Sequence, residues 1–218
     1  MKEWSARKLA LALLVPSFGF LLAMVVVGVT TGATQELHEH YALPTVYKKQ
    51  LLAHADAVRV MFALDVGFIV AYTAFFAAFA RYLHALGRPF AYLALGAMLA
   101  VSALDLVEDH HILALLDAAE AGTVPNVEQI AWQVAESATK FSVSYVALFL
   151  FGLAIPRDTR LGVVLALFLT VVTVATGVLG LAAPPAWRAA IDNGRWLGFA
   201  IGFALAAAWL RKAPEPAR

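Results

Sequence analysis

Residues 89–122 read PFAYLALGAMLAVSALDLVEDHHILALLDAAEAG, and this stretch sets the interpretation of the whole chain. Its first half, up to Leu104, is apolar apart from one serine, which is typical of a helix in lipid. Its second half carries ionisable side chains, at Asp105, Glu108, Asp109, His110 and His111. Pro89 suits the first turn of a helix and Gly122 suits its end. The three carboxyl groups then lie on one helix face and need partners, because residues three and four apart are neighbours.

The composition is that of an integral membrane protein. Of the 218 residues, 62% are hydrophobic and 14% are charged, and the mean hydropathy is +0.78, whereas soluble domains carry about 25% charged residues. The absence of cysteine excludes disulfides, thiolate metal ligands and a cysteine nucleophile. With a net charge of +1 and no basic stripe or phosphate-binding glycine loop, the chain is not expected to bind nucleic acid.

Apolar stretches of nearly the roughly 20 residues that a membrane-spanning helix needs recur along the chain. They cover residues 9–30, 58–80, 90–112, 130–155, 161–182 and 191–210. The first is longer than the core of a cleavable signal peptide, so we expect it to remain as a span. The predicted fold is therefore an all-α integral membrane protein, a six-transmembrane-helix bundle. Residues 1–212 form its single domain, and residues 213–218 form a short flexible C-terminal tail.

The distribution of lysine and arginine predicts an N-in/C-in topology. With a cytoplasmic N-terminus, the positive-inside rule is satisfied by many basic residues on the inner side. These are Lys2, Arg7, Lys8, Arg81, Arg88, Arg157, Arg160, Arg211, Lys212 and Arg218. The longest outer segment is then 31–57. The predicted location is the inner (plasma) membrane of a bacterial-type cell.

Ionisable side chains from four different spans fall at one predicted depth: Asp65, Asp105, Lys140 and Arg195. Counting about 20 residues back from the inner end of each span places them roughly 6–8 Å inside the outer boundary. Each costs about 2.5–3.5 kcal/mol in lipid on insertion scales, so they are expected to face the bundle interior and pair. Two interpretations stay open: ion pairs that only fix helix register, or an outward-facing polar cavity with a general acid or base.

The second interpretation assigns roles to particular residues. A polar stripe at helical spacing is formed by Gln133, Glu136, Ser137, Lys140 and Ser144. The candidate catalytic residues are Asp105, Glu108, Glu136 and Lys140, with Asp105 and Glu108 as the acid/base pair. The candidate substrate-binding residues are Asp65, Asp109, Gln133 and Arg195. Lys140 and Arg195 are expected to hold an anionic group or a developing oxyanion.

The histidines leave a metal site open. Glu108 and His111 form an E-x-x-H pair, the spacing found in helical di-metal carboxylate proteins, although a second copy of the pair is missing. His38 and His40, in the first outer segment, would complete a zinc or iron site by folding over the helix ends. The alternative for these two histidines is a solvated outer loop.

Two classes of function fit these patterns. The first is a membrane-embedded enzyme that performs acid/base or metal-assisted chemistry on a lipid-like substrate in an outward-facing site. The second is a non-catalytic membrane subunit, or a small ligand-binding or proton-coupled transport protein, in which the charged cluster is structural or binds a ligand. Membrane lipid is the expected partner in both, within a homo-oligomer or a larger membrane complex.

Overall fold

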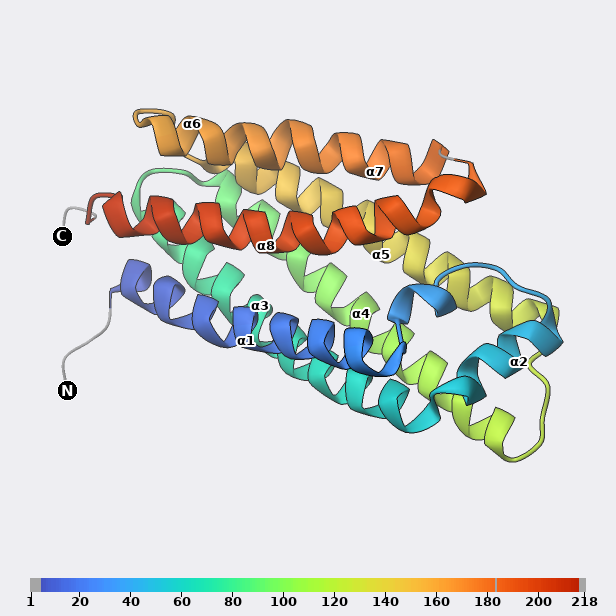
Figure 1. The fold of residues 1–218 in the computed structure, drawn as a ribbon. Coiled ribbons are helices and arrows are strands. Elements are labelled where there is room, and N and C mark those ends of the chain that lie inside the picture. Colours follow the sequence, from blue (N-terminus) through green and yellow to red (C-terminus); the bar gives the residue numbers. More distant parts are fainter. Residues whose placement is uncertain (1–4, 183, 216–218) are drawn as a thin grey trace. The chain divides into compact units, whose positions relative to one another are not determined.

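A computed structural model of the chain describes residues 5–182 and 184–215. Residues 1–4, 183 and 216–218, which include the end of the predicted tail, lie outside this part. Within the described ranges the secondary structure is helical throughout, with no strand (Figure 1). The predicted all-α class is therefore confirmed.

Long helices dominate the chain. They are α1 (Ala6–Thr31), α3 (Ala55–Ala85), α4 (Phe90–Glu120), α5 (Val127–Ala154) and α8 (Arg188–Lys212). Between α5 and α8, the short helix α6 (Arg160–Leu167), the π-helical turn η2 (Phe168–Val172) and α7 (Thr173–Ala182) follow one another directly. Smaller elements are η1 (Gln35–His38), α2 (Pro44–Ala53) and η3 (Pro185–Trp187).

Among the residues that the structure describes, five helical segments are long and apolar enough to cross a membrane: α1, α3, α4, α5 and the continuous run Arg160–Gly180. They coincide with the first five predicted spans, which supports a multi-pass membrane protein. The sixth predicted span, residues 191–210, lies within α8 but is not one of these five.

Helix α4 begins just after Pro89 and ends just before Gly122, the two residues that mark its ends in the sequence. Gly122 has a φ of +95°, a conformation that costs glycine little. The N–H of Thr123 donates to the carbonyl of Ala118 (2.9 Å) and that of Gly122 to Ala119 (3.1 Å), which is the Schellman pattern of a helix end. At 31 residues, α4 is about 46 Å long and extends eight residues past the predicted span end.

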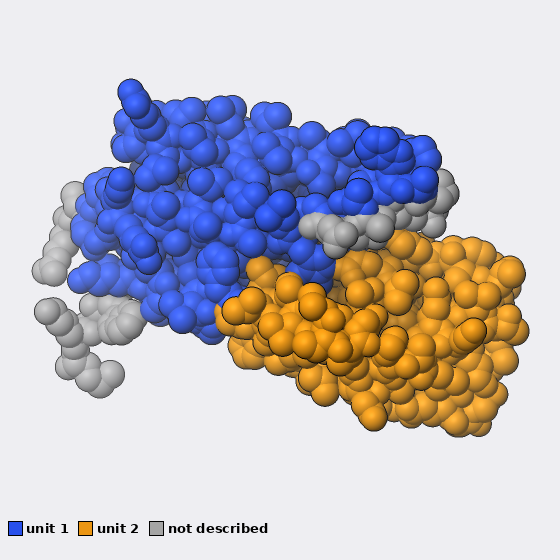
Figure 2. Space-filling model, viewed as in Figure 1, with its two compact units in different colours: residues 1–18, 71–100, 142–218 blue, residues 19–70, 101–141 orange. Residues whose placement is uncertain are grey.

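The chain divides into two compact units, which Figure 2 colours separately. Unit 1 comprises residues 1–18, 71–100 and 142–218, and unit 2 comprises residues 19–70 and 101–141. Each of α1, α3, α4 and α5 therefore contributes residues to both units. The two units have different interiors and are described separately.

Unit 1 has an aromatic core. Phe75 and Phe79, one turn apart on α3, stack with ring centroids 5.4 Å apart. Phe79 also packs against Phe151 of α5 at 5.7 Å and against the edge of Trp209 of α8 at 6.0 Å. Aromatic pairs at such distances contribute beyond the area they bury, so this core depends on shape.

Unit 2 contains a small apolar core where the segment between α1 and α3 packs onto the helices. Pro44 occupies the first position of α2, where its missing N–H costs no hydrogen bond. Tyr47 and Leu51, one turn apart on α2, are fully buried in a cluster with Val58 of α3 and Ile112 of α4. Tyr47 and Leu51 thus anchor one face of α2 on the other helices of unit 2.

Candidate functional site

Unit 2 pairs one buried lysine with two carboxyl groups of α4. Lys140 Nζ, on α5, lies 2.8 Å from Asp105 Oδ1 and also contacts Glu108 Oε2. The exposed fractions of the three side chains are 6%, 12% and 0% for Lys140, Asp105 and Glu108. Because Asp105 and Glu108 are three residues apart on one helix, a single ammonium group reaches both.

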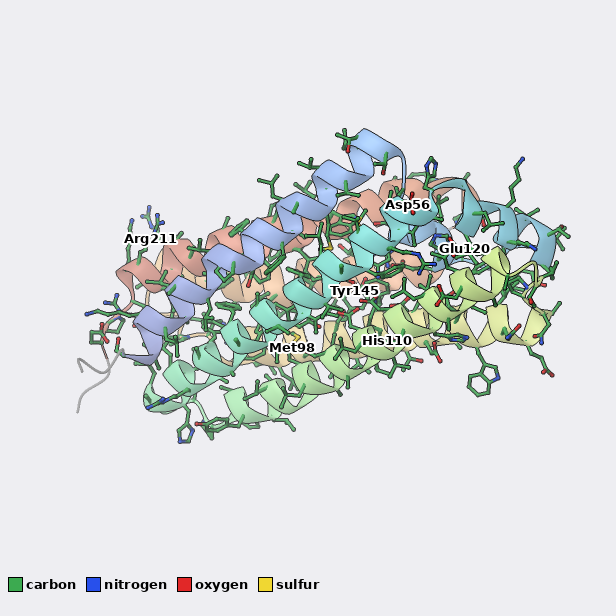
Figure 3. All side chains as sticks on the ribbon, turned by 90° about the horizontal axis from the view of Figure 1, so that it is seen from below. Asp56, Met98, His110, Glu120, Tyr145 and Arg211 are labelled. Carbon is green, nitrogen blue, oxygen red and sulfur yellow. The ribbon has the colours of Figure 1, made fainter. Side chains whose placement is uncertain are left out.

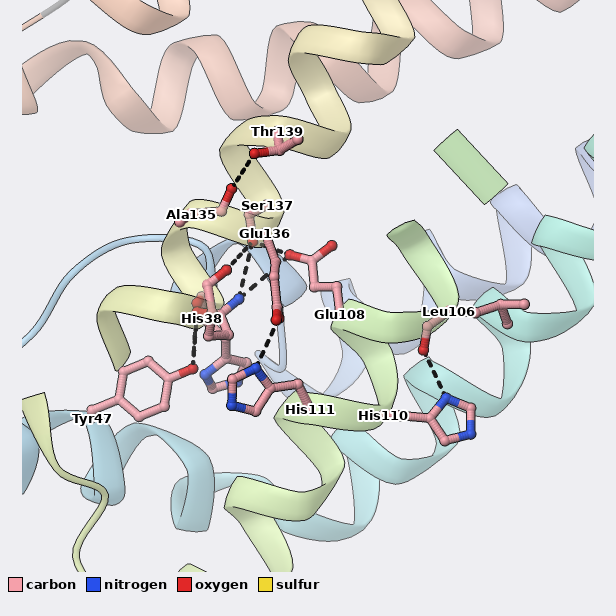
Figure 4. Close-up of polar contacts among 11 residues, drawn as sticks. His38, Tyr47, Leu106, Glu108, His110, His111, Ala135, Glu136, Ser137 and Thr139 are labelled. Atoms are coloured by element: carbon pink, nitrogen blue, oxygen red, sulfur yellow. Dashed lines mark hydrogen bonds and ion pairs between the residues drawn. The ribbon is translucent and has the colours of Figure 1, made fainter. Parts of the chain in front are cut away.

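The other oxygen of Glu108 accepts from uncharged donors (Figure 4). Ser137 Oγ donates to Glu108 Oε1, and Gln133 Nε2 lies 3.4 Å from the same oxygen and 3.0 Å from Ser137 Oγ. Tyr47 Oη donates to Gln133 Oε1 at 3.2 Å. Burial, and after it the negative charge of Glu108, raise the pKa of Tyr47, so its hydroxyl stays protonated and able to donate. A chain of hydrogen bonds therefore runs from Tyr47 to Glu108.

A second group of carboxyls surrounds Gln35 of η1. Gln35 Nε2 lies 3.3 Å from Asp65 Oδ2 and 3.5 Å from Asp109 Oδ1. All three side chains are buried, with exposed fractions of 6%, 5% and 0% for Gln35, Asp65 and Asp109. Asp109 Oδ2 has no hydrogen-bond partner within the described ranges. One amide group thus bridges two carboxyls and leaves one carboxyl oxygen unsatisfied.

Carboxyl groups outnumber cationic groups inside unit 2. Five carboxyl-bearing residues are buried when backbone and side chain are counted together: Glu39, Asp65, Asp105, Glu108 and Asp109. Lys140 is the one lysine or arginine of this unit that the structure describes as buried to the same degree. A buried charge without a partner is costly, and in practice such a group becomes neutral. The cluster therefore favours carboxyls that hold protons, or a further cation beside them.

The predicted catalytic residue Glu136 belongs to a separate contact. Its Oε2 lies 2.8 Å from His111 Nδ1, and the two side chains are 23% and 24% exposed. The neighbouring His110 is exposed, and its Nδ1 lies 2.7 Å from the carbonyl of Leu106. The two histidines of α4 thus point to different partners, as their adjacent positions predict.

The four predicted metal ligands are not gathered around one point. Glu108 contacts Lys140, and His111 contacts Glu136. His38 is 1% exposed with its ring edge-on to Tyr47 at 5.8 Å, and His40 is half-buried. In the part of the chain that the structure describes, no three His, Asp or Glu side chains are placed to hold a metal ion. The zinc or iron site stays a prediction.

Burial sets the protonation of His38. It lowers the pKa of His38 from 6.5 to about 4, so the imidazole is neutral at physiological pH. Its Nδ1 has no hydrogen-bond partner among the described residues. A solvated loop, the alternative considered for His38, is wrong for this side chain.

The last predicted site residue lies elsewhere. Arg195, predicted to bind substrate at the depth of Asp65 and Lys140, is half-buried on α8 and belongs to unit 1. Its predicted role in a common charged layer stays a prediction.

Three residues of the cluster were not among the predicted site residues: Gln35, Tyr47 and Ser137. Ser137 carries a signal, since it follows Gln133 by one turn and precedes Lys140 by three residues on the polar stripe. Tyr47 carries another, since Pro44 marks a helix start and Tyr47 and Leu51 then share a face. Nothing local marks Gln35, because its partners on α3 and α4 are 30 and 74 residues away.

Comparison of the chain with protein-family models, with curated proteins and with solved structures gave no match. The fold and the site define a polytopic helical membrane protein with a buried cluster of carboxyl groups around one lysine.

Proposed function

We propose that this protein is a proton-coupled transport protein of the bacterial-type inner membrane, in which the buried carboxyl groups of unit 2 take up and release protons. The observation that carries this proposal is the excess of buried carboxyls over Lys140. Carboxyl groups within membrane spans typically mark ion pathways and proton relays.

The proposed protein has six spans, with both termini inside and residues 1–212 as one functional domain. Helix α8 supplies the sixth span, since its 25 residues extend about 37 Å and the hydrocarbon core is about 30 Å thick. Its last turn carries Arg211 and Lys212, and the first turn of α1 carries Arg7 and Lys8. These clusters support an inner location for both ends.

Gln35 and Lys140 each hold two carboxyl groups close together, which gives a proton on one carboxyl a neighbouring acceptor. The amide N–H of Gln35 only donates and does not itself carry the proton. Gln35 touches both Asp65 and Asp109, and Lys140 touches both Asp105 and Glu108. The void beside Gln35 and His38 has no room for a water molecule. A proton needs only a donor and an acceptor within hydrogen-bond distance, so tight packing here favours proton transfer over the binding of a large substrate.

The test measures proton uptake directly. Purified protein is titrated with acid while infrared spectroscopy follows the carbonyl band of protonated carboxyl groups. Asp109→Asn and Asp65→Asn are expected each to remove part of this band, whereas Glu128→Gln, an exposed carboxyl at the start of α5, leaves the buried part unchanged. In vesicles under an imposed potential, the same two variants are expected to slow proton flux about a hundredfold, the lower end of the range for losing a proton-transfer group. A band and a flux that neither variant alters would refute the proposal.

The second candidate is the membrane-embedded enzyme. The contact between His111 and Glu136 favours it, because both side chains are partly exposed and a substrate can reach them. A carboxylate on Nδ1 orients the ring and leaves Nε2 as a general base, here one helical turn from Glu108 on α4. Such an enzyme would act on a lipid-like substrate by acid/base or metal-assisted chemistry.

Turnover and metal content test this candidate with a matched pair of variants. Incubation with a bacterial lipid extract, followed by mass spectrometry, is expected to show a product that His111→Ala abolishes and His110→Ala retains. Elemental analysis of the same proteins examines zinc and iron. Equal turnover by both variants would exclude His111 as the base, and equal metal content would exclude it as a ligand.

A further inference from the structure

Unit 1 has a cavity that plays no part in the proposed proton chemistry. It has a volume of about 370 Å³, within the usual range for ligand sites. It is formed by the turn between α3 and α4, the first turn of α6 and the end of α8. Among the described residues, three basic side chains line it, Arg88, Arg160 and Lys212, against one acidic side chain, Asp158.

The backbone around the cavity is fixed at each of the three elements. Gly87, at a φ of +77°, ends α3 and places Arg88, whose N–H donates to the carbonyl of Leu83 at 3.1 Å. Thr159 caps α6, since its Oγ1 accepts from the N–H of Gly162 at 3.1 Å. The basic side chains therefore project from rigid positions.

The third wall is the segment that follows α8. Tyr82 Oη donates to the carbonyl of Pro214 at 2.7 Å, and Arg7 Nη1 donates to that of Ala213 at 3.2 Å. Arg7 also pairs with Glu215 at 2.7 Å and holds the pKa of that carboxyl below its usual range. Glu215 is therefore already engaged by Arg7.

The lining has a clear charge preference. Arg88, Arg160 and Lys212 form no ion pair within the part of the chain that the structure describes. The backbone N–H groups at the start of a helix add to this positive potential, and α6 starts in the cavity wall. Arginine and lysine with a helix N-terminus are the groups that bind phosphate.

Apolar side chains complete the wall. Leu86, Leu161 and Trp209 line the same cavity, each near one end of a helix: α3, α6 and α8. Tryptophan is enriched where a membrane meets water, and all three basic residues belong to the set that predicts the inner side of the membrane. A phosphate group attached to a hydrophobic tail matches both halves of this lining.

We infer that the cavity of Arg88, Arg160 and Lys212 binds the phosphate headgroup of an anionic membrane lipid. Basic pockets between helices at the cytoplasmic side are known lipid headgroup sites in membrane proteins. The ligand is held by charge at the phosphate and by Leu161 and Trp209 beside its first carbons.

The test compares adjacent basic residues at the end of α8. Both side chains are exposed, but Lys212 lines the cavity, whereas Arg211 does not and extends away from the helix (Figure 3). Purified protein in detergent is titrated with phosphatidylglycerol, and native mass spectrometry counts the retained lipid. Arg160→Gln and Lys212→Gln are expected each to weaken retention about fivefold, the effect of one basic contact with an anionic lipid. Arg211→Gln is expected to match the wild type.

Three results would overturn the inference. Equal weakening by Arg211→Gln and Lys212→Gln would show a diffuse attraction, and equal retention of phosphatidylcholine would show no preference for an anionic lipid. Full displacement of phosphatidylglycerol by an equal concentration of inorganic phosphate would identify a soluble ligand. Arg160→Lys, which keeps the charge, is expected to stay within about twofold of the wild type, because lysine also binds phosphate as a point charge. This variant separates lost binding from lost folding.

Discussion

Units 1 and 2 bury different kinds of side chain, although α1, α3, α4 and α5 contribute to both. The core of unit 1 is a set of aromatic rings in which Phe79 touches three neighbours from α3, α5 and α8. The interior of unit 2 contains five buried carboxyls and Lys140. The same four helices thus contribute to unit 1, whose core depends on the packing of aromatic rings, and to unit 2, whose interior depends on how charges and protons are arranged.

The difference determines which substitutions each unit tolerates. In a packed apolar region, a change of volume is felt because the neighbours cannot all move. In a buried ionic cluster, a change of charge is felt because the remaining group is left without a partner. A substitution that keeps the size of a side chain but changes its charge is therefore expected to affect unit 2 most. One that keeps the charge but changes the size is expected to affect unit 1 most.

The largest effect is expected from removing the cation of unit 2. Lys140→Met keeps a similar length but leaves Asp105 and Glu108 without their ammonium group, and we expect the unfolding free energy to fall by about 3–5 kcal/mol. Thermal unfolding in detergent measures this. Lys48→Met is the control, because Lys48 is near the surface and donates to the backbone carbonyl of Gly122. Losses of similar size in the two variants would contradict an ionic interior.

Much of the cluster was predictable because helical periodicity fixes which side chains share a face. At 3.6 residues per turn, Asp105 and Glu108 share one face of α4, and Gln133 and Lys140, two turns apart, share one face of α5. Charged side chains within apolar spans also generally face the bundle interior and pair with one another. The contact of Lys140 with Asp105 and Glu108 is the result.

The rest depends on tertiary contacts that periodicity does not encode. Gln35 enters the cluster only because η1 folds back onto α3 and α4. Glu136 and Ser137 are adjacent in sequence, yet Glu136 pairs with His111 whereas Ser137 donates to Glu108. Counting residues gives the depth of a side chain in the membrane but not the direction in which it leaves its helix. The depth of Arg195 therefore does not determine which side chains it contacts. The cavity at Lys212 depends on how Tyr82 and Arg7 hold the segment after α8.

The next effect depends on pH and again concerns unit 2. The pKa of His38 is about 4 in the folded chain and 6.5 in an unfolded one. Between these values the unfolded state binds one more proton, so stability falls as the pH decreases from about 6.5 to about 4, by roughly 3 kcal/mol in total.

Replacing His38 tests this assignment. The unfolding free energy of His38→Gln, followed from pH 7 downward, is expected to fall less steeply than that of the wild type. His54→Gln, an exposed histidine in the same segment, is expected to follow the wild type. Parallel curves for His38→Gln and the wild type would show that His38 is not the group responsible.

A smaller effect is expected from added volume in unit 1. A Cβ atom on Gly162 would lie 2.2 Å from the carbonyl oxygen of Pro156, and backbone atoms cannot move aside as a side chain can. We expect Gly162→Ala to lower the unfolding free energy by about 1–3 kcal/mol. Gly96→Ala, at a site in unit 1 where a Cβ meets no atom within 4 Å, is the control. A neutral Gly162→Ala would mean that the turn before α6 adjusts freely.

The smallest effect is expected at the hydrogen-bond chain between the two kinds of interior in unit 2. Tyr47 packs its ring in the apolar core while its hydroxyl donates to Gln133 Oε1. Tyr47→Phe keeps the ring and removes the donor to a fully buried amide, which costs about 1 kcal/mol of unfolding free energy. Tyr41→Phe, at a ring that is 51% exposed, is expected to lower the unfolding free energy less than half as much.

Because the chain of hydrogen bonds from Tyr47 ends at Glu108, the infrared carbonyl band also separates the two roles of this hydroxyl. A shift of the band in Tyr47→Phe links the hydroxyl to the protons of the cluster, and an unchanged band with the same loss of stability limits it to packing.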